Sequence, residues 1–82
     1  MSVTVQNNWE NIGCFTDGSP VLAIRVYNGH RMVGRVVDMA NGCYRADFVN
    51  MEGDLVEIMF QEYYDAVTRI AEEAVARHRT IN

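Results

Sequence analysis

The alternation of apolar and polar residues in the middle of the chain predicts β-strands joined by tight turns. Runs with a period of two cover residues 21–27, 31–39, 43–50 and 54–59, and Asn-Gly at 28–29, Asn-Gly at 41–42 and Met-Glu-Gly at 51–53 separate them. Asn-Gly between alternating runs is the strongest short signal for a hairpin, because a type I′ turn needs positive φ at both central residues. We therefore expect an antiparallel meander of four strands.

These turns predict which residues lie opposite one another. With the first Asn-Gly pair as a two-residue turn, Ile24 lies opposite Val33; with the second, Asp38 lies opposite Arg45 as a favourable cross-strand ion pair. The third turn fits a three-residue loop, because a two-residue loop would put Glu57 on an otherwise apolar face. In each case the glycines serve as corners of a sheet.

The same registers divide the side chains between two faces, since successive residues of a strand point to opposite sides. The first face is apolar and collects Leu22, Ile24, Val26, Val33, Val37, Met39, Tyr44, Ala46, Phe48, Val56, Ile58 and Phe60. The second face is mixed and collects Val21, Ala23, Arg25, Tyr27, His30, Met32, Gly34, Val36, Asp38, Arg45, Asp47, Val49, Leu55, Glu57 and Met59.

After Phe60 the period changes to about 3.6, which predicts a C-terminal helix over about 60–79 that lies across the apolar face. Asp65–Arg69 and Glu73–Arg77 are spaced as i,i+4 ion pairs on its outer side. Residues 11–16 read as a further edge strand, and Trp9 is expected to cap one end of the core. The sequence thus predicts an α+β domain spanning 1–82, with four to five strands and one helix.

Composition supports a folded domain and disfavours a general polyanion binder. The chain has 82 residues, 49% of them hydrophobic, and a formal net charge of −4. The charge is uneven, since residues 1–45 sum to +1 and residues 46–82 to −5. All seven basic residues are Arg. A protein that follows a phosphate backbone is expected to be basic along its groove.

The chain shows no basic start followed by an apolar run, and no apolar stretch near the roughly 20 residues of a membrane span. Cys14 and Cys43 lie far apart and outside any CxxC pattern. We therefore expect two free thiols and a cytoplasmic location.

No set of residues predicts catalysis, a metal site or a cofactor site. His30 flanks a turn and His78 lies near the end of the helix, so the two could approach each other only if the helix folded back in one particular way. Neither Cys14 nor Cys43 has a neighbouring base in sequence that would activate its thiol, and no Cys or His pair has the short spacing of metal ligands. We expect a protein that is not an enzyme.

The second face has more apolar residues than a fully solvent-exposed surface usually carries, which predicts an interface. The expected contact residues there are Met32, Val36, Val49, Leu55 and Met59. We expect a homodimer through this face or a free strand edge, with Val36 pointing away from the helix. The acidic helix exterior offers a second contact surface through Glu62, Asp65, Glu72 and Glu73.

These features favour a small non-enzymatic protein-interaction module with an unidentified protein partner, such as an inhibitor or adaptor of the kind that phages and other mobile elements encode. The alternative is a single-stranded nucleic-acid binder that uses Arg25, Tyr27, His30 and Arg45 as a stacking platform. In architecture alone, four antiparallel strands followed by a helix resemble small dimeric single-strand binders of the transcription-coactivator type. The acids Asp38, Asp47 and Glu57 on that face argue against this alternative.

Overall fold

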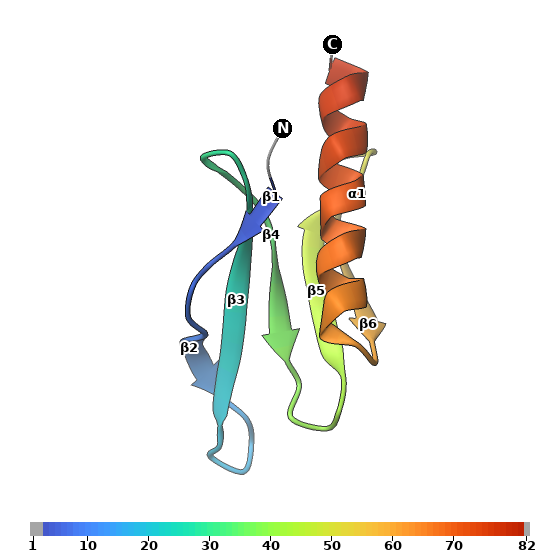
Figure 1. Cartoon of the computed structure of the whole chain (residues 1–82). Helices are drawn as coiled ribbons and strands as arrows, with labels where there is room; N and C mark the ends of the chain where they lie inside the picture. Colours follow the sequence, from blue (N-terminus) through green and yellow to red (C-terminus); the bar gives the residue numbers. More distant parts are fainter. Residues whose placement is uncertain (1–2, 82) are drawn as a thin grey trace.

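A computed structural model describes the backbone of residues 3–81 and the side chains of residues 3–77. Six strands precede one helix: β1 (Val3–Val5), β2 (Glu10–Cys14), β3 (Pro20–Asn28), β4 (Arg31–Asp38), β5 (Tyr44–Val49), β6 (Leu55–Phe60) and α1 (Tyr63–Ile81). The strands form one antiparallel sheet, and α1 packs on one face, mainly over β4 and β5 (Figure 1). The predicted α+β meander with a C-terminal helix is confirmed. The helix begins later than expected because the strand pattern continues through Phe60.

The order of strands across the sheet is β1-β3-β4-β5-β6, and β2 also pairs with β3. β1 pairs with residues 26–28 of β3 and β2 with residues 20–23, so the two N-terminal strands share one edge. Between β1 and β2, Gln6 provides hydrogen-bond partners for the backbone of β3. Its backbone N donates to Arg25 O at 2.9 Å, and its Oε1 accepts from Arg25 N at 3.2 Å. The expected edge strand at 11–16 is present as β2, and β1 is an additional strand.

The turn between β5 and β6 has the predicted register. The backbone N of Asn50 donates to Asp54 O at 2.9 Å, and the N of Gly53 donates to Asn50 O at 3.0 Å. Gly53 has φ of 89°, a value that residues with a Cβ rarely adopt. The Oδ1 of Asn50 also accepts from the backbone N of Glu52 at 3.0 Å. This register places Val56, Ile58 and Phe60 on the side of the helix, as predicted.

The turn between β3 and β4 is displaced by one residue from its prediction. Asn28 is the last residue of β3 and pairs with Arg31, so the two-residue turn is Gly29-His30. Gly29 has φ of 64°, whereas His30 has no positive φ. Positive φ at the first central residue alone is the pattern of a type II′ turn.

A β-bulge follows this turn in β4. Tyr27 pairs with Met32 and Val26 pairs with Gly34, which leaves Val33 as the extra residue. A bulge of this kind places two residues of one strand opposite one residue of the other. Val33 therefore lies with Gly34 on the helix side, and it packs against the core as predicted.

The connection between β4 and β5 has five residues, 39–43, where the sequence predicted a two-residue turn. The Oδ1 of Asp38 accepts from Ala40 N at 2.9 Å, and the Oδ1 of Asn41 accepts from Cys43 N at 3.1 Å. These local side-chain bonds give the backbone an alternative to the ladder. Asp38 consequently pairs with Tyr44, and the predicted Asp38–Arg45 cross-strand pair is wrong.

The bulge and the longer connection reverse the two faces of β4 from Gly34 to Asp38 relative to the prediction. Val36 pairs with Ile24 and Ala46 on the side of the helix, and its side chain is 0% exposed. Val37 lies on the opposite face. The assignments of Gly34, Val36 and Asp38 to the second face, and of Val37 to the apolar face, are wrong for this reason. Met39 lies in the connection and belongs to neither face.

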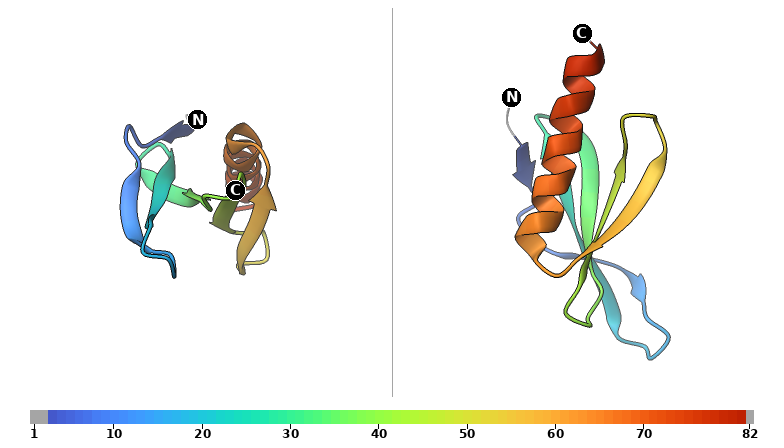
Figure 2. Two further views of the ribbon diagram at one scale, coloured as in Figure 1. Left: turned by 90° about the horizontal axis from the view of Figure 1, so that it is seen from below. Right: turned by 90° about the vertical axis from the view of Figure 1, so that its right-hand side faces the viewer.

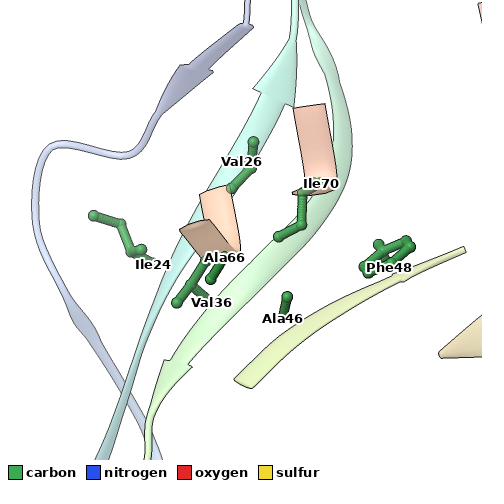
Figure 3. Packing of buried hydrophobic residues seen from close by; sticks show 7 residues of the cluster. All are labelled: Ile24, Val26, Val36, Ala46, Phe48, Ala66 and Ile70. Atoms are coloured by element: carbon green, nitrogen blue, oxygen red, sulfur yellow. The ribbon is translucent and has the colours of Figure 1, made fainter. Parts of the chain in front are cut away.

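The core lies between the sheet and α1. Its buried cluster contains Ile24, Val26, Val36, Ala46, Phe48, Ala66 and Ile70 (Figure 3). Gly34 lets the helix approach closely, since a Cβ added there would lie 2.7 Å from Ile70 Cγ2 and 2.8 Å from Asp47 O. The helix therefore rests on the backbone of β4 at this position.

One end of the core is closed by an aromatic cluster. The Trp9 ring centroid lies 5.7 Å from that of Tyr63 and 6.4 Å from that of Tyr44, and the two tyrosine rings meet edge to face at 5.9 Å. Burial raises the pKa of Tyr63. The expected role of Trp9 as a cap on the core is confirmed.

The arginines of α1 face the sheet more than the sequence predicted. Arg69 lies 5.7 Å from the ring centroid of Phe48 and pairs with Glu73 at 3.5 Å, in place of the expected pairs Asp65–Arg69 and Glu73–Arg77. Arg77 Nη1 donates to the carbonyl oxygens of Val49 and Asn50, both at 3.5 Å. The cation and the long aliphatic stem of Arg suit such half-buried positions.

Candidate interaction surfaces

The face of the sheet opposite α1 is not covered by a helix, and Figure 2 shows α1 on the other side. We call it the open face. Pairing across the strands places on it Ala23, Arg25 and Tyr27 of β3, Met32, Arg35 and Val37 of β4, Arg45, Asp47 and Val49 of β5, and Leu55, Glu57 and Met59 of β6. The predicted interface residues Met32, Val49, Leu55 and Met59 thus share one face. Val36 is not among them, because it is buried under α1.

Charged side chains cross the centre of the open face. Arg25 pairs with Arg35, Arg35 with Asp47, and Asp47 with Glu57, so one row runs over four strands. Like charges opposite one another repel. The Arg25–Arg35 repulsion is offset because each guanidinium has a carboxylate of its own, Glu10 for Arg25 at 3.0 Å and Asp47 for Arg35 at 3.0 Å.

Asp47 is the centre of this network and the buried charged residue of the open face. Its Oδ1 accepts from Arg45 Nε at 2.8 Å, and its Oδ2 accepts from Arg45 Nη2 and Arg35 Nε, both at 3.0 Å. Glu57 lies 3.7 Å from Arg45 Nη2. The hydrogen bond with Asp47 raises the pKa of Arg45 against the opposing effect of burial. Three arginines therefore face three acids, Glu10, Asp47 and Glu57, and the network carries no net formal charge.

The arginines proposed for the nucleic-acid alternative already have carboxylate partners in this network, and His30 lies outside it. A hydrogen bond with Tyr27 and the charge of Glu10 raise the pKa of Arg25. Arg45 is bound to Asp47, and His30 lies in the exposed β3–β4 turn. Arginines that already have carboxylate partners must lose them to contact phosphates, which weakens binding. Tyr27 is half-buried, so its ring offers a limited stacking surface.

An apolar patch occupies one end of the open face, where the β3–β4 and β5–β6 turns lie. Met32 is 54% exposed and Leu55 72% exposed, and Leu55 pairs directly with the exposed Val49. We call these three residues the apolar patch. Met59, 50% exposed, lies at the other end of β6 opposite Arg45. Leu55 and Met59 therefore lie at the two ends of β6 on the open face.

The acidic surface of α1 is only partly available. Glu62, Asp65 and Glu72 are exposed, whereas Glu73 is half-buried and paired with Arg69. A shallow open groove runs along the helix flank between α1 and β1, and is lined by Val3, Tyr64, Val67, Thr68, Ala71, Glu72, Val75 and Ala76. Tyr64 at its rim is 76% exposed. The 3.6-residue period of the sequence places Tyr64, Val67, Ala71 and Val75 in the apolar stripe of the helix, and in the structure these four residues line the groove.

The two cysteines lie in different parts of the fold. Cys14 is an exposed thiol in β2 and Cys43 a half-buried thiol before β5. Within residues 3–77 the side chains form no group of three or more His, Cys, Asp or Glu that could hold a metal ion. The side chain of His78 lies outside the described residues. The one helix of the described chain is not apolar enough to cross a membrane.

Comparison of the chain with protein-family models, with curated proteins and with solved structures gives no match. The geometry of the open face and of the β6 edge therefore carries the functional interpretation.

Proposed function

We propose that the protein is a small non-enzymatic interaction module that binds a protein partner through the open face. The observation that carries this proposal is the apolar patch beside a neutral, internally paired charge network. An exposed apolar surface rimmed by polar residues is typical of a protein contact site. An interface core is depleted in unpaired charge, and here the ion pairs are formed before a partner arrives.

Burial of the apolar patch supplies part of the energy for recognition. Full burial of a Val, Leu or Met side chain contributes about 1.5–3 kcal/mol relative to full exposure. Met32, Val49 and Leu55 are about half exposed on average, so burying the remainder contributes roughly 2–5 kcal/mol before the cost of association. The preformed contacts of Arg35 and Arg45 with Asp47 reduce the side-chain entropy lost on binding.

The small size and acidic charge fit an inhibitor or adaptor of the kind that mobile elements encode, with the acidic helix as an additional contact. In that role Glu62, Asp65 and Glu72 are the residues available to a basic partner, since Glu73 is already bound to Arg69. A basic partner would be attracted by these charges in a salt-dependent way.

The proposal is tested by recovering binding partners from nuclease-treated extract of the source cell with three baits. Wild type and Tyr64→Lys should retain the same partner, and Leu55→Lys should lose it. Leu55 and Tyr64 are both largely exposed, so both substitutions should leave the fold intact, and the helix variant is the matched control. Loss with Tyr64→Lys but not with Leu55→Lys would move the site to the helix groove. Recovery of nucleic acid alone, before nuclease treatment, would favour the single-strand alternative.

A further inference from the structure

The two edges of the sheet are protected unequally. The β1–β2 edge is short and broken, and β2 carries a register shift between Asn11 and Gly13. β6 forms the other margin of the sheet (Figure 2), has six residues, and pairs with β5 without a shift. Its sequence is Leu-Val-Glu-Ile-Met-Phe, with one charge and no proline. Natural proteins usually protect an edge with short strands, bulges, proline or charged side chains, and of these β6 has a single charge, Glu57.

The backbone groups that β6 leaves unpaired follow from the hairpin. Asn50 and Asp54 form a hydrogen-bonded pair, and hydrogen-bonded pairs alternate along an antiparallel ladder. Val56, Ile58 and Phe60 therefore direct their N–H and C=O groups toward β5. Leu55, Glu57 and Met59 direct theirs outward, to the free edge of the sheet.

We infer that this edge pairs with β6 of a second copy of the chain, antiparallel across a two-fold axis at Ile58, to form one continuous sheet. The inference goes beyond the proposed function, since it concerns the free edge of β6 and leaves the apolar patches of both copies exposed on a common open face. A two-fold axis perpendicular to the sheet keeps both helices on one side. Residues of the same face must then lie opposite one another, so the axis passes through a residue pair and not between residues.

Charge selects the axis at Ile58 from the neighbouring choice at Glu57. An axis at Glu57 would put the two Glu57 side chains opposite each other, with Asp47 beside each in the next strand. Like charges directly opposite are destabilising. An axis at Ile58 puts Glu57 opposite Met59 of the second copy, whose neighbour in the next strand is Arg45. Glu57 then lies between its own Arg45, at 3.7 Å, and Arg45 of the second copy.

The same register suits the helix side of the strand. Ile58 lies opposite Ile58, and Val56 lies opposite Phe60 of the second copy. These side chains are half-exposed in the single chain. Pairs of β-branched and aromatic residues are among the favourable cross-strand pairs. Both surfaces of β6 are therefore self-complementary in one register.

Disulfide cross-linking tests the register directly, in a background with Cys14→Ser and Cys43→Ser. Across the axis Ile58 forms a non-hydrogen-bonded pair with a Cα separation of about 4.5 Å, within the range of a disulfide. The two Glu57 Cα atoms would be about 8 Å apart, from the rise of two residues and the strand spacing, which is beyond disulfide reach. Oxidised Ile58→Cys should therefore run as a covalent dimer and Glu57→Cys as a monomer. The reverse result, or no cross-link in an Ile58→Cys variant that melts like its background, would overturn the inference.

Light scattering of variants at Met59 supplies a test that needs no cysteine. Met59→Pro removes an outward N–H and leaves the β5 ladder intact, so it should stay folded. Two donors are lost per dimer at about tenfold each, so the dissociation constant should rise on the order of 100-fold. Met59→Val keeps the donor and should remain dimeric. A wild-type monomer at high micromolar concentration would refute the second copy as the occupant of β6. The capture of a partner that depends on Leu55 tests the proposed function independently, because that binding does not require the dimer.

Discussion

Gly34 lies on the helix side of β4, contrary to the sequence-based assignment, and Gly34→Ala tests this placement. An added Cβ would lie 2.7 Å from Ile70 Cγ2, 2.8 Å from Asp47 O and 3.2 Å from Phe48 Cβ. Carbon atoms in ordinary contact are about 3.5–4.0 Å apart, so the helix would have to move by close to 1 Å. Two of the three neighbouring atoms belong to the backbone or to a Cβ and cannot rotate away.

Overpacking of a well-filled core costs about 1–3 kcal/mol. Replacing Gly by Ala restricts the unfolded chain and returns about 0.4–1 kcal/mol of that at most. We therefore expect a net loss of about 1–2 kcal/mol from a total stability of roughly 4–12 kcal/mol for a domain of this size. The melting temperature should fall by about 4–16 °C.

Urea unfolding followed by the fluorescence of Trp9, the one tryptophan of the chain, measures this loss. Trp9 contacts Tyr63 of the helix and Tyr44 of the sheet, so its emission reports on their docking. Ile70→Leu provides the matched background, because Leu has a single Cγ that can turn away from residue 34. Part of the penalty of Gly34→Ala should disappear in that background, with a coupling of about 0.5–2 kcal/mol. If Gly34→Ala melted like wild type, the helix would not rest on β4 as described.

Four further outcomes are expected. Val36→Asp should unfold the protein, because it leaves an unpaired charge at a fully buried site at a cost of about 3–5 kcal/mol. Leu55→Asp, at an exposed site, should keep the wild-type circular dichroism. A folded Val36→Asp monomer would instead support the face assignment predicted from the sequence. Gly53→Val should cost about 1–2 kcal/mol in urea unfolding because φ is 89° there, and no change would mean that the β5–β6 turn differs. Labelled single-stranded DNA or RNA should bind no tighter than tens of micromolar at about 0.15 M salt in a fluorescence anisotropy titration, and submicromolar binding lost with Arg25→Glu would favour the nucleic-acid alternative. Burial raises the pKa of Tyr63, so this side chain ionises at lower pH in the unfolded chain than in the folded one. The free energy of unfolding should therefore be constant below the usual tyrosine pKa of about 10 and fall as the pH rises above it. Urea unfolding of Tyr63→Phe should show a smaller loss of stability at alkaline pH.

The elements that depend on local sequence could be predicted. The Asn50–Asp54 closure with Gly53 at positive φ follows from loop length and turn chemistry, which involve neighbouring residues only. The helix follows from its period, and Trp9 as a cap follows from its place outside the strands. Met32, Val49, Leu55 and Met59 were placed on the correct face because β5 and β6 are registered by that turn and Met32 lies before the bulge.

The faces of β4 could not be predicted, and the reason is physical. Val33, Val36 and Val37 put apolar residues on both sides of this strand, so alternation alone does not choose between them. The predicted registers with β3 and β5 each differ from the structure by an odd number of residues. Two such errors together reverse residues 34–38 of β4, whereas Met32 and Val33 keep their predicted faces. Agreement between the two hairpins could not reveal the error.

The sequence by itself determined the local elements: four long strands, their turn-forming glycines and an amphipathic helix after Phe60. The tertiary structure decided which side of β4 the helix covers. Ile70 of the helix packs against Gly34, which has no side chain, and this contact places Gly34 on the helix side. It also decided that Asp47 binds Arg35 and Arg45, so these two arginines of the open face are already paired with a carboxylate. Both depend on contacts between residues distant in sequence, whose energies exist only when the whole sheet and helix are assembled.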